Sequence, residues 1–150
     1  MFGRRRQTAA PAPQVSPLSA AEVEWRDHQL TVAAVLAEAY AGDPSAPPAL
    51  ATLDAVVAGW LADDHGIDVN TVVNAVGVAF GEHVARDAGL QWVIATDEHG
   101  SDLALHGRPG DVLVHPANAV ARRVVEGRTP FVADLHAELV HGVRRALADG

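Results

Sequence analysis

The hydrophobic residues of this chain change their spacing at Leu90, and this change constrains the fold more than any other feature. Before Leu90 they recur every three or four residues, which is typical of amphipathic helices. From Leu90 to His115 they form short alternating runs, which are typical of strands, and helical spacing returns after Pro116. Because helices and strands are segregated along the chain, we expect an α+β fold rather than a parallel α/β sheet.

Three helices are expected between Ser19 and Gly89. Ser19 and Glu22 form a capping-box pattern at the start of the first, and Asp68 or Asn70 can cap the third. The third is apolar over a wide arc, so we expect it to be the central helix. The glycines expected to end the three helices are Gly42, Gly66 and Gly89.

Three strands and two further helices are expected after Gly89. The strands are the runs 90–96, 101–106 and 112–115, and the two short turns between them predict an antiparallel meander. Pro116 is suited to the first position of the fourth helix, and Thr129 with Pro130 gives a similar start signal for the fifth. The expected order is therefore three helices, a three-stranded meander and two helices.

Residues 1–18 are rich in proline and alanine, and we expect them to form a disordered tail before a single domain at residues 19–150. The basic run Arg4–Arg6 is not followed by the apolar stretch that a signal peptide needs. No apolar run is long enough to cross a membrane. We therefore expect a cytosolic protein, and the many alanines with arginine in place of lysine suggest a bacterial source.

The charge and the residue types exclude several classes of function. The chain has 19 acidic and 11 basic residues, a net charge of −8, which disfavours general binding to nucleic acids. It has no cysteine, which excludes disulfides, thiolate metal sites and cysteine nucleophiles. We recognise no serine-hydrolase, zinc-protease or phosphate-loop motif, and we expect no cofactor and no metal.

The expected hairpins place two acidic residues beside two histidines. If 97–100 and 107–110 are four-residue loops, Asp102 lies opposite His115 and His106 lies opposite Asp111, on the sheet face away from the apolar residues. A carboxylate beside an imidazole can serve general-base chemistry, and histidine with aspartate also occurs at metals. Each pair alone offers only two ligands, so simple cross-strand ion pairing is the interpretation that we favour for both pairs. The apolar face would carry Trp92, Ile94, Leu103, Leu105, Val112 and Val114.

A basic pair in the fourth helix completes the set of candidates. Arg122 and Arg123 could bind an anion, or pair with acidic groups of the hairpin, or remain solvated. We predict no catalytic residue. The predicted binding residues are Asp97, Asp102, His115, Arg122 and Arg123.

The C-terminal half resembles a bacterial family known as domain of unknown function 3806. The family pattern is a glycine-rich helix ending in Gly-Glu, a strand with tryptophan, an Asp-x-x-Gly-x-Asp-x-Ala hairpin, and a helix that starts with proline and carries a basic pair. The matching residues are Gly77, Gly81, Glu82, Trp92, Asp97, Gly100, Asp102, Ala104, Pro116 and Arg123. The resemblance implies a related fold and no particular activity.

Two functions follow from these features. The first is a non-enzymatic protein-interaction or regulatory module that binds another protein, such as a basic one, or a second copy of itself. The second is a small-ligand-binding protein or an enzyme that uses Asp102 and His115, with Arg122 or Arg123 holding an anion. A salt-sensitive complex would favour the first, and a concave pocket at the sheet face would favour the second.

Overall fold

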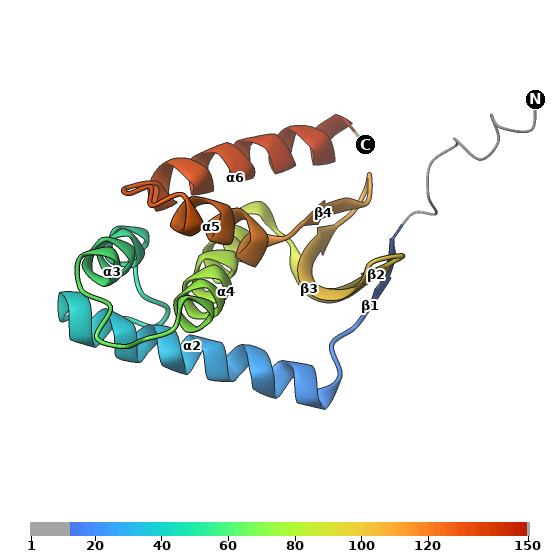
Figure 1. The fold of residues 1–150 in the computed structure, drawn as a ribbon. Helices are drawn as coiled ribbons and strands as arrows, with labels where there is room; N and C mark the ends of the chain where they lie inside the picture. The colour runs from blue at the N-terminus through green and yellow to red at the C-terminus, as the bar shows by residue number, and fades with distance from the viewer. Residues whose placement is uncertain (1–12, 150) are drawn as a thin grey trace, which may run out of the picture.

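The computed structural model describes residues 13–149, which form five helices and a four-stranded sheet (Figure 1). This is an α+β fold, as the sequence predicts. The elements in chain order are β1 (Gln14–Ser16), α2 (Ala20–Ala41), α3 (Leu50–Ala62), α4 (Val69–Ala88), β2 (Gln91–Asp97), β3 (Gly100–Gly107), β4 (Val112–Val114), α5 (Pro116–Val125) and α6 (Val132–Asp149).

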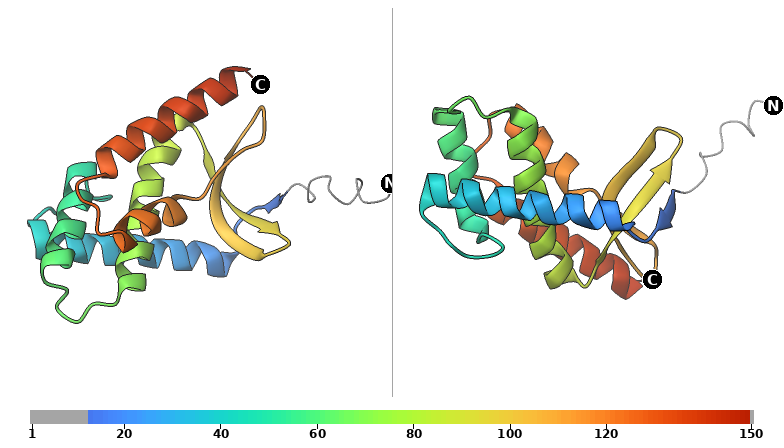
Figure 2. Two further views of the ribbon diagram at one scale, coloured as in Figure 1. Left: turned by 45° about the horizontal axis from the view of Figure 1, so that its top comes forward. Right: turned by 90° about the horizontal axis from the view of Figure 1, so that it is seen from below.

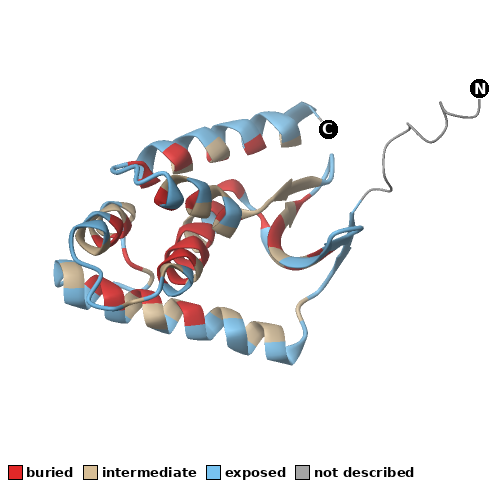
Figure 3. Cartoon of the chain, in the orientation of Figure 1, coloured by how far each residue is buried: buried red, intermediate tan, exposed pale blue. Residues whose placement is uncertain are grey.

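The helices pack around α4, and the sheet lies at one end of the helical part (Figures 1 and 2). Helix α4 contacts α2, α3, α5 and α6. Much of this helix is buried (Figure 3). Its side chains form the middle of the core, and Phe80, Val76 and Val84 are inaccessible to solvent. The prediction that this helix is central is therefore confirmed. None of the helices within residues 13–149 is long and apolar enough to cross a membrane.

The ends of the first and third helices are as predicted. The Ser19 side chain accepts a hydrogen bond from the Glu22 amide, and the Glu22 carboxylate accepts one from the Ser19 amide at 2.7 Å. Asp68 caps α4 through the Asn70 amide. Gly42 and Gly89 adopt the left-handed conformation that ends a helix. Helix α3 ends at Ala62, earlier than expected, so Gly66 lies in the following loop.

The sheet has one strand more than the sequence predicts. Residues Gln14–Ser16, which we expected to belong to a tail, form β1 and pair with Ile94–Thr96 of β2. Pro17 ends this strand because it cannot donate to the ladder. The strand order is β1-β2-β3-β4, and all pairs are antiparallel. Residues 1–12 of the predicted tail lie outside the described residues.

The two hairpins differ in how well the sequence predicts them. The predicted register of β2 and β3 is confirmed, since Trp92 pairs with Leu105. The predicted register of β3 and β4 is wrong by two residues, because Leu105 pairs with Val114 and Gly107 with Val112. Gly107 is thus a strand residue and not the start of a turn. A shift of two leaves every side chain on its expected face. The helical core contacts four residues of the predicted apolar face: Trp92, Leu105, Val112 and Val114. The opposite face, however, also has a small buried cluster of Val93, Ala95 and Ala104.

Helix α6 begins at Val132, two residues beyond the predicted start at Thr129 and Pro130. Its first turn is capped by a residue of another helix. One carboxylate oxygen of Asp54 in α3 accepts hydrogen bonds from the amides of Phe131 and Val132, both at 2.8 Å. This contact joins α3 to α6 across 77 residues of sequence, so neighbouring residues alone could not predict it.

Candidate functional site

A cleft of about 250 Å³ lies where α2, α4, the sheet and the start of α5 meet. Apolar and aromatic side chains make most of its wall, with amides, an imidazole and a carboxylate among them. Its lining residues are Trp25, Asn74, Gly77, Val78, Trp92, Asp102, Leu103, His115, Pro116, Ala117 and Asn118. It therefore combines apolar surface with a few polar groups, as small binding sites do.

Trp92 is held in the cleft wall by two residues of α4. Its indole nitrogen donates a hydrogen bond of 2.6 Å to Glu82 Oε1. Its ring lies against Gly81, where a Cβ atom would come within 2.7 Å of Trp92 Cζ2. Only glycine leaves room for the ring there, so Gly81 and Glu82 together fix its position.

The start of α5 is set by a second close approach to α4. A Cβ atom on Gly77 would come within 2.7 Å of Ala117 Cα, so the two backbones touch at this point. Pro116 has no amide hydrogen and suits the first turn of a helix. The glycine pair Gly77 and Gly81 therefore shapes the cleft by admitting α5 and Trp92.

Pro116 also leaves half of β3 without a partner. Strand β4 pairs only with Leu105–Gly107 and then turns away into α5 (Figure 1). No strand formed by residues 13–149 lies beside Gly100–Ala104 on that side. We call Gly100–Ala104 the free edge of β3. It borders the cleft, because Asp102 and Leu103 belong to both.

The ladder determines which backbone groups face the free edge. The β2–β3 hairpin has a two-residue turn closed by Asp97 and Gly100, and such a turn is closed by a hydrogen-bonded pair. Hydrogen-bonded pairs alternate along an antiparallel ladder. Asp102 and Ala104 therefore bond to β2, whereas the amides and carbonyls of Ser101 and Leu103 point to the free edge.

Residues 50–136 match a protein family, described as Domain of unknown function (DUF3806). This match covers more than half of the chain. The chain belongs to the DUF3806 family. No curated protein and no solved structure matches it. The DUF3806 match spans every cleft residue except Trp25.

Four of the ten residues that carry the DUF3806 resemblance line the cleft, and two more hold Trp92 in its wall. Gly77, Trp92, Asp102 and Pro116 line it. Gly81 and Glu82 hold Trp92, as described above. The structure thus brings together residues from α4, β2, β3 and α5 that lie far apart in sequence.

The predicted pair of Asp102 and His115 does not form across two strands. With the observed register, the position opposite His115 would be Ala104, and β4 ends at Val114 before that pair is made. Asp102 lies on the free edge and His115 precedes α5. Both residues nevertheless line the cleft.

The second predicted pair, His106 and Asp111, is in contact, but the two residues do not lie opposite each other on paired strands. His106 lies opposite Leu113, not Asp111. Asp111 lies in the β3–β4 turn with a positive φ of 48°, and its Oδ1 is 3.1 Å from His106 Nε2. This is a local contact that ties the turn to β3, away from the cleft.

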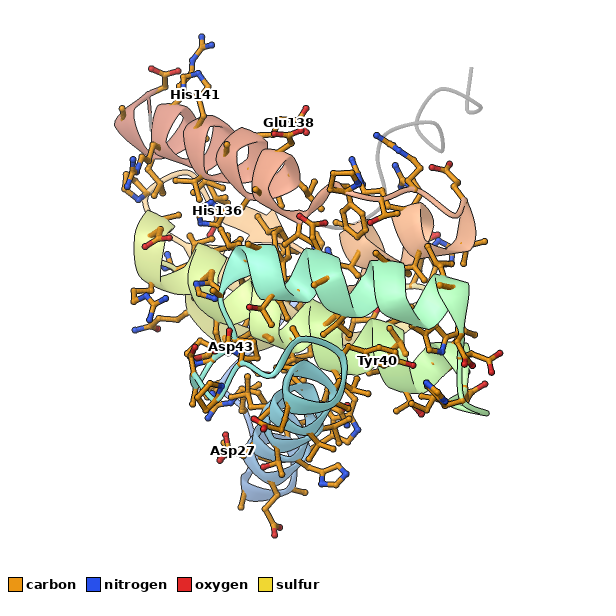
Figure 4. All side chains as sticks on the ribbon, turned by 90° about the vertical axis from the view of Figure 1, so that its left-hand side faces the viewer. Asp27, Tyr40, Asp43, His136, Glu138 and His141 are labelled. Atoms are coloured by element: carbon orange, nitrogen blue, oxygen red, sulfur yellow. The ribbon has the colours of Figure 1, made fainter. Side chains whose placement is uncertain are left out.

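The remaining predicted residues lie outside the cleft. Asp97 accepts a hydrogen bond of 2.7 Å from the His99 amide and so stabilises the β2–β3 turn. Arg122 is exposed and lines a groove between α5 and α6 that also contains His115 and Glu138. Arg123 lines the same groove and donates to the Ala119 carbonyl at 3.0 Å. Glu138 of α6, which lines this groove, is labelled in Figure 4.

Sequence reasoning did not identify Trp25, Asn74 and Asn118 as site residues. The exposed fraction of Trp25 is 42%, which is large for a tryptophan, but exposure is not visible in the sequence. The two asparagines have no motif around them. Within residues 13–149, no three histidine or acidic side chains come together as a metal site would require.

Proposed function

We propose that this protein is a non-enzymatic interaction module that binds an extended segment of a partner protein along the free edge of β3. One observation carries the proposal: the backbone groups of Ser101 and Leu103 face a side of β3 where, among residues 13–149, no strand runs. An unpaired strand edge is the template that extended peptides use when they add a strand to a sheet.

The cleft supplies a pocket for a side chain of that segment. In strand addition the backbone bonds give affinity, and pockets for alternate side chains give specificity. Leu103 and Trp92 lie on the same face of the sheet, which is the face of the cleft. A volume of about 250 Å³ is below the roughly 300–1,000 Å³ of pockets for drug-sized ligands. One side chain of the segment is a suitable occupant.

Binding of a small free ligand is the second candidate. It is favoured by the presence of Asp102 and His115 in one cleft. A free ligand would not need the backbone groups of Ser101 and Leu103, so the two candidates predict different results for the same variants. A cytosolic, bacterial setting remains a prediction from the sequence under either candidate.

The experiment uses blocked five-residue peptides of alternating β-prone residues and the full-length protein. Binding is measured from chemical-shift changes at the Ser101 and Leu103 amides and at the Trp25 indole. A matched peptide with N-methyl groups on alternate amides keeps the side chains and removes the backbone donors. We expect the first peptide to bind in the millimolar range and the methylated one to show no saturation.

A pair of variants tests the same point on the protein. Ser101→Pro removes an amide that faces the free edge, whereas proline is tolerated at strand edges. Ser101→Ala is the control, because both variants lose the hydroxyl contact with Thr96. We expect Ser101→Pro to abolish peptide binding and Ser101→Ala to preserve it. Equal binding by both variants, or by both peptides, would overturn strand addition and leave the small-ligand candidate.

A further inference from the structure

We infer that the bound segment carries a basic side chain beside Asp102 and, next to it in sequence, an apolar side chain that enters the cleft. This inference rests on the proposed strand addition and names the chemistry of the partner. It uses three observations: the alternation of side chains on β3, the charge of the β2–β3 hairpin and the residues of the cleft wall.

Strand alternation separates two adjacent positions on the free edge. Asp102 lies opposite Ala95, and Leu103 lies opposite Ile94, so their side chains point to opposite faces of the sheet. A segment added beside β3 alternates in the same way. Its residue beside Leu103 faces the cleft, and the neighbouring residue lies beside Asp102 on the other face of the sheet.

Apart from two histidines, the charged residues of the β2–β3 hairpin are acidic. The hairpin from Gln91 to Gly107 contains Asp97, Glu98 and Asp102 and no arginine or lysine. Asp102 is exposed, and within residues 13–149 its carboxylate has no ion pair and no hydrogen bond. Opposite charges on neighbouring strands stabilise a sheet and like charges destabilise it. A lysine or arginine beside Asp102 is therefore favoured, and an acidic residue is disfavoured.

The cleft favours an uncharged residue next to the basic residue of the segment. Its wall includes the rings of Trp25 and Trp92 and the side chains of Val78, Leu103 and Pro116. No arginine lines it, and its only acidic residue is Asp102, whose side chain points to the other face of the sheet. An apolar side chain gains by removing this surface from water. The expected segment thus has a basic residue directly next to an apolar one, in extended conformation.

The test compares three blocked peptides that differ only at the position of the basic residue: arginine, citrulline and glutamate. Citrulline keeps the shape of arginine and removes its charge. We expect the citrulline peptide to bind about fivefold more weakly than the arginine peptide, given a charged pair worth up to about 1 kcal/mol. The glutamate peptide should bind more weakly still, and added salt should reduce the difference.

Two variants of the protein assign the effect to Asp102. Asp102→Asn should make the arginine and citrulline peptides bind equally. Asp111→Asn changes the net charge by the same amount at a residue outside the cleft, and it should preserve the preference for arginine. Together they separate local pairing from the general attraction of an acidic protein.

The outcomes separate this inference from the proposed function. If the arginine and citrulline peptides bind equally to the unmodified protein, and N-methylation still abolishes binding, strand addition holds. The inference that the segment carries a basic residue is then overturned. If Asp111→Asn weakens the preference as much as Asp102→Asn, pairing at Asp102 is overturned. If none of the peptides binds, both proposals fail, and the free edge is protected by Asp102 against strand pairing.

Discussion

Asp54 shows how one side chain connects two distant helices. It lies on α3, and one oxygen of its carboxylate accepts hydrogen bonds from the first two amides of the α6 region, those of Phe131 and Val132. The first amides of a helix have no partner within it, so an external acceptor stabilises the start of the helix. The contact is partly buried, which limits replacement by water.

We expect Asp54→Ala to lower the free energy of unfolding by about 1–2 kcal/mol, the usual cost of losing a helix cap. Urea denaturation of the full-length protein measures the change. Asp54→Asn keeps an oxygen acceptor at the same place and should retain at least half of the lost stability. An alanine variant as stable as the unmodified protein would show that α6 does not need this cap.

Asp43 performs a similar role in the loop between α2 and α3 (Figure 4). Its carboxylate accepts hydrogen bonds from the Ser45 amide at 2.9 Å, from the Ser45 hydroxyl, and from Thr52 Oγ1 at 2.6 Å. These bonds, first of all those from the two hydroxyls, favour the charged form and hold the pKa of Asp43 well below its ordinary value of 3.8.

The lowered pKa predicts a loss of stability in acid. The folded state binds a proton at Asp43 less readily than the unfolded chain, so the stabilisation is complete above the ordinary pKa of 3.8. It is lost as the pH falls from that value towards the folded pKa. We expect Asp43→Asn to lower stability at neutral pH and to flatten its decline below about pH 4. The free energy of unfolding of both proteins is measured at a series of pH values. If it falls equally steeply with decreasing pH in both proteins, this prediction is contradicted.

At the scale of elements, close approach between backbones shapes the cleft. Helix α4 admits the Trp92 ring at Gly81 and the start of α5 at Gly77. By contrast, Gly142 in α6 has no atom within 4 Å of the place where a Cβ would lie. The two kinds of helical glycine should therefore respond in opposite ways to the addition of a methyl group.

We expect Gly81→Ala to destabilise the protein by about 1–3 kcal/mol, because the new methyl group overlaps the indole of Trp92. Gly142→Ala should stabilise it by about 0.5–1 kcal/mol, because alanine loses less backbone freedom on folding. Thermal unfolding of both variants measures the difference. Similar shifts of the unfolding temperature, of the same sign in both variants, would mean that Trp92 does not pack on Gly81 as described.

The sequence predicts those elements whose signals are local. Ser19 with Glu22, Gly42 and Gly89 mark helix ends through contacts within a few residues, and the structure has them as predicted. The register of β2 and β3 follows from a short turn and an alternating pattern, and it is also confirmed.

Contacts between distant residues explain the predictions that were wrong. Gly107 has the sequence signature of a turn, but it lies in β3 opposite Val112, and the side chain of Leu90 packs against its bare Cα. Strand β1 has three residues and is stabilised by pairing with β2, almost 80 residues away. The cleft itself combines Trp25 with residues up to Asn118, and no local pattern shows that they meet.

In the molecule as a whole, the sheet is incomplete at one edge. Pro116 diverts the chain from β4 into α5, and the helices hold a cleft beside the part of β3 that β4 does not cover. The proposed function thus depends on Pro116, which ends β4, and on Gly77 and Gly81 of α4, which shape the cleft. In the proposed complex, the acidic hairpin selects for a basic residue in the bound segment.

Amide hydrogen exchange along β3 shows whether the free edge is unpaired in the protein alone. In the protein alone, the amides of Asp102 and Ala104 should be protected by β2, and those of Ser101 and Leu103 should exchange rapidly. On adding the arginine peptide, Ser101 and Leu103 should become protected as well. Equal protection of all four amides in the protein alone would show that the edge of β3 is already occupied and would contradict the account.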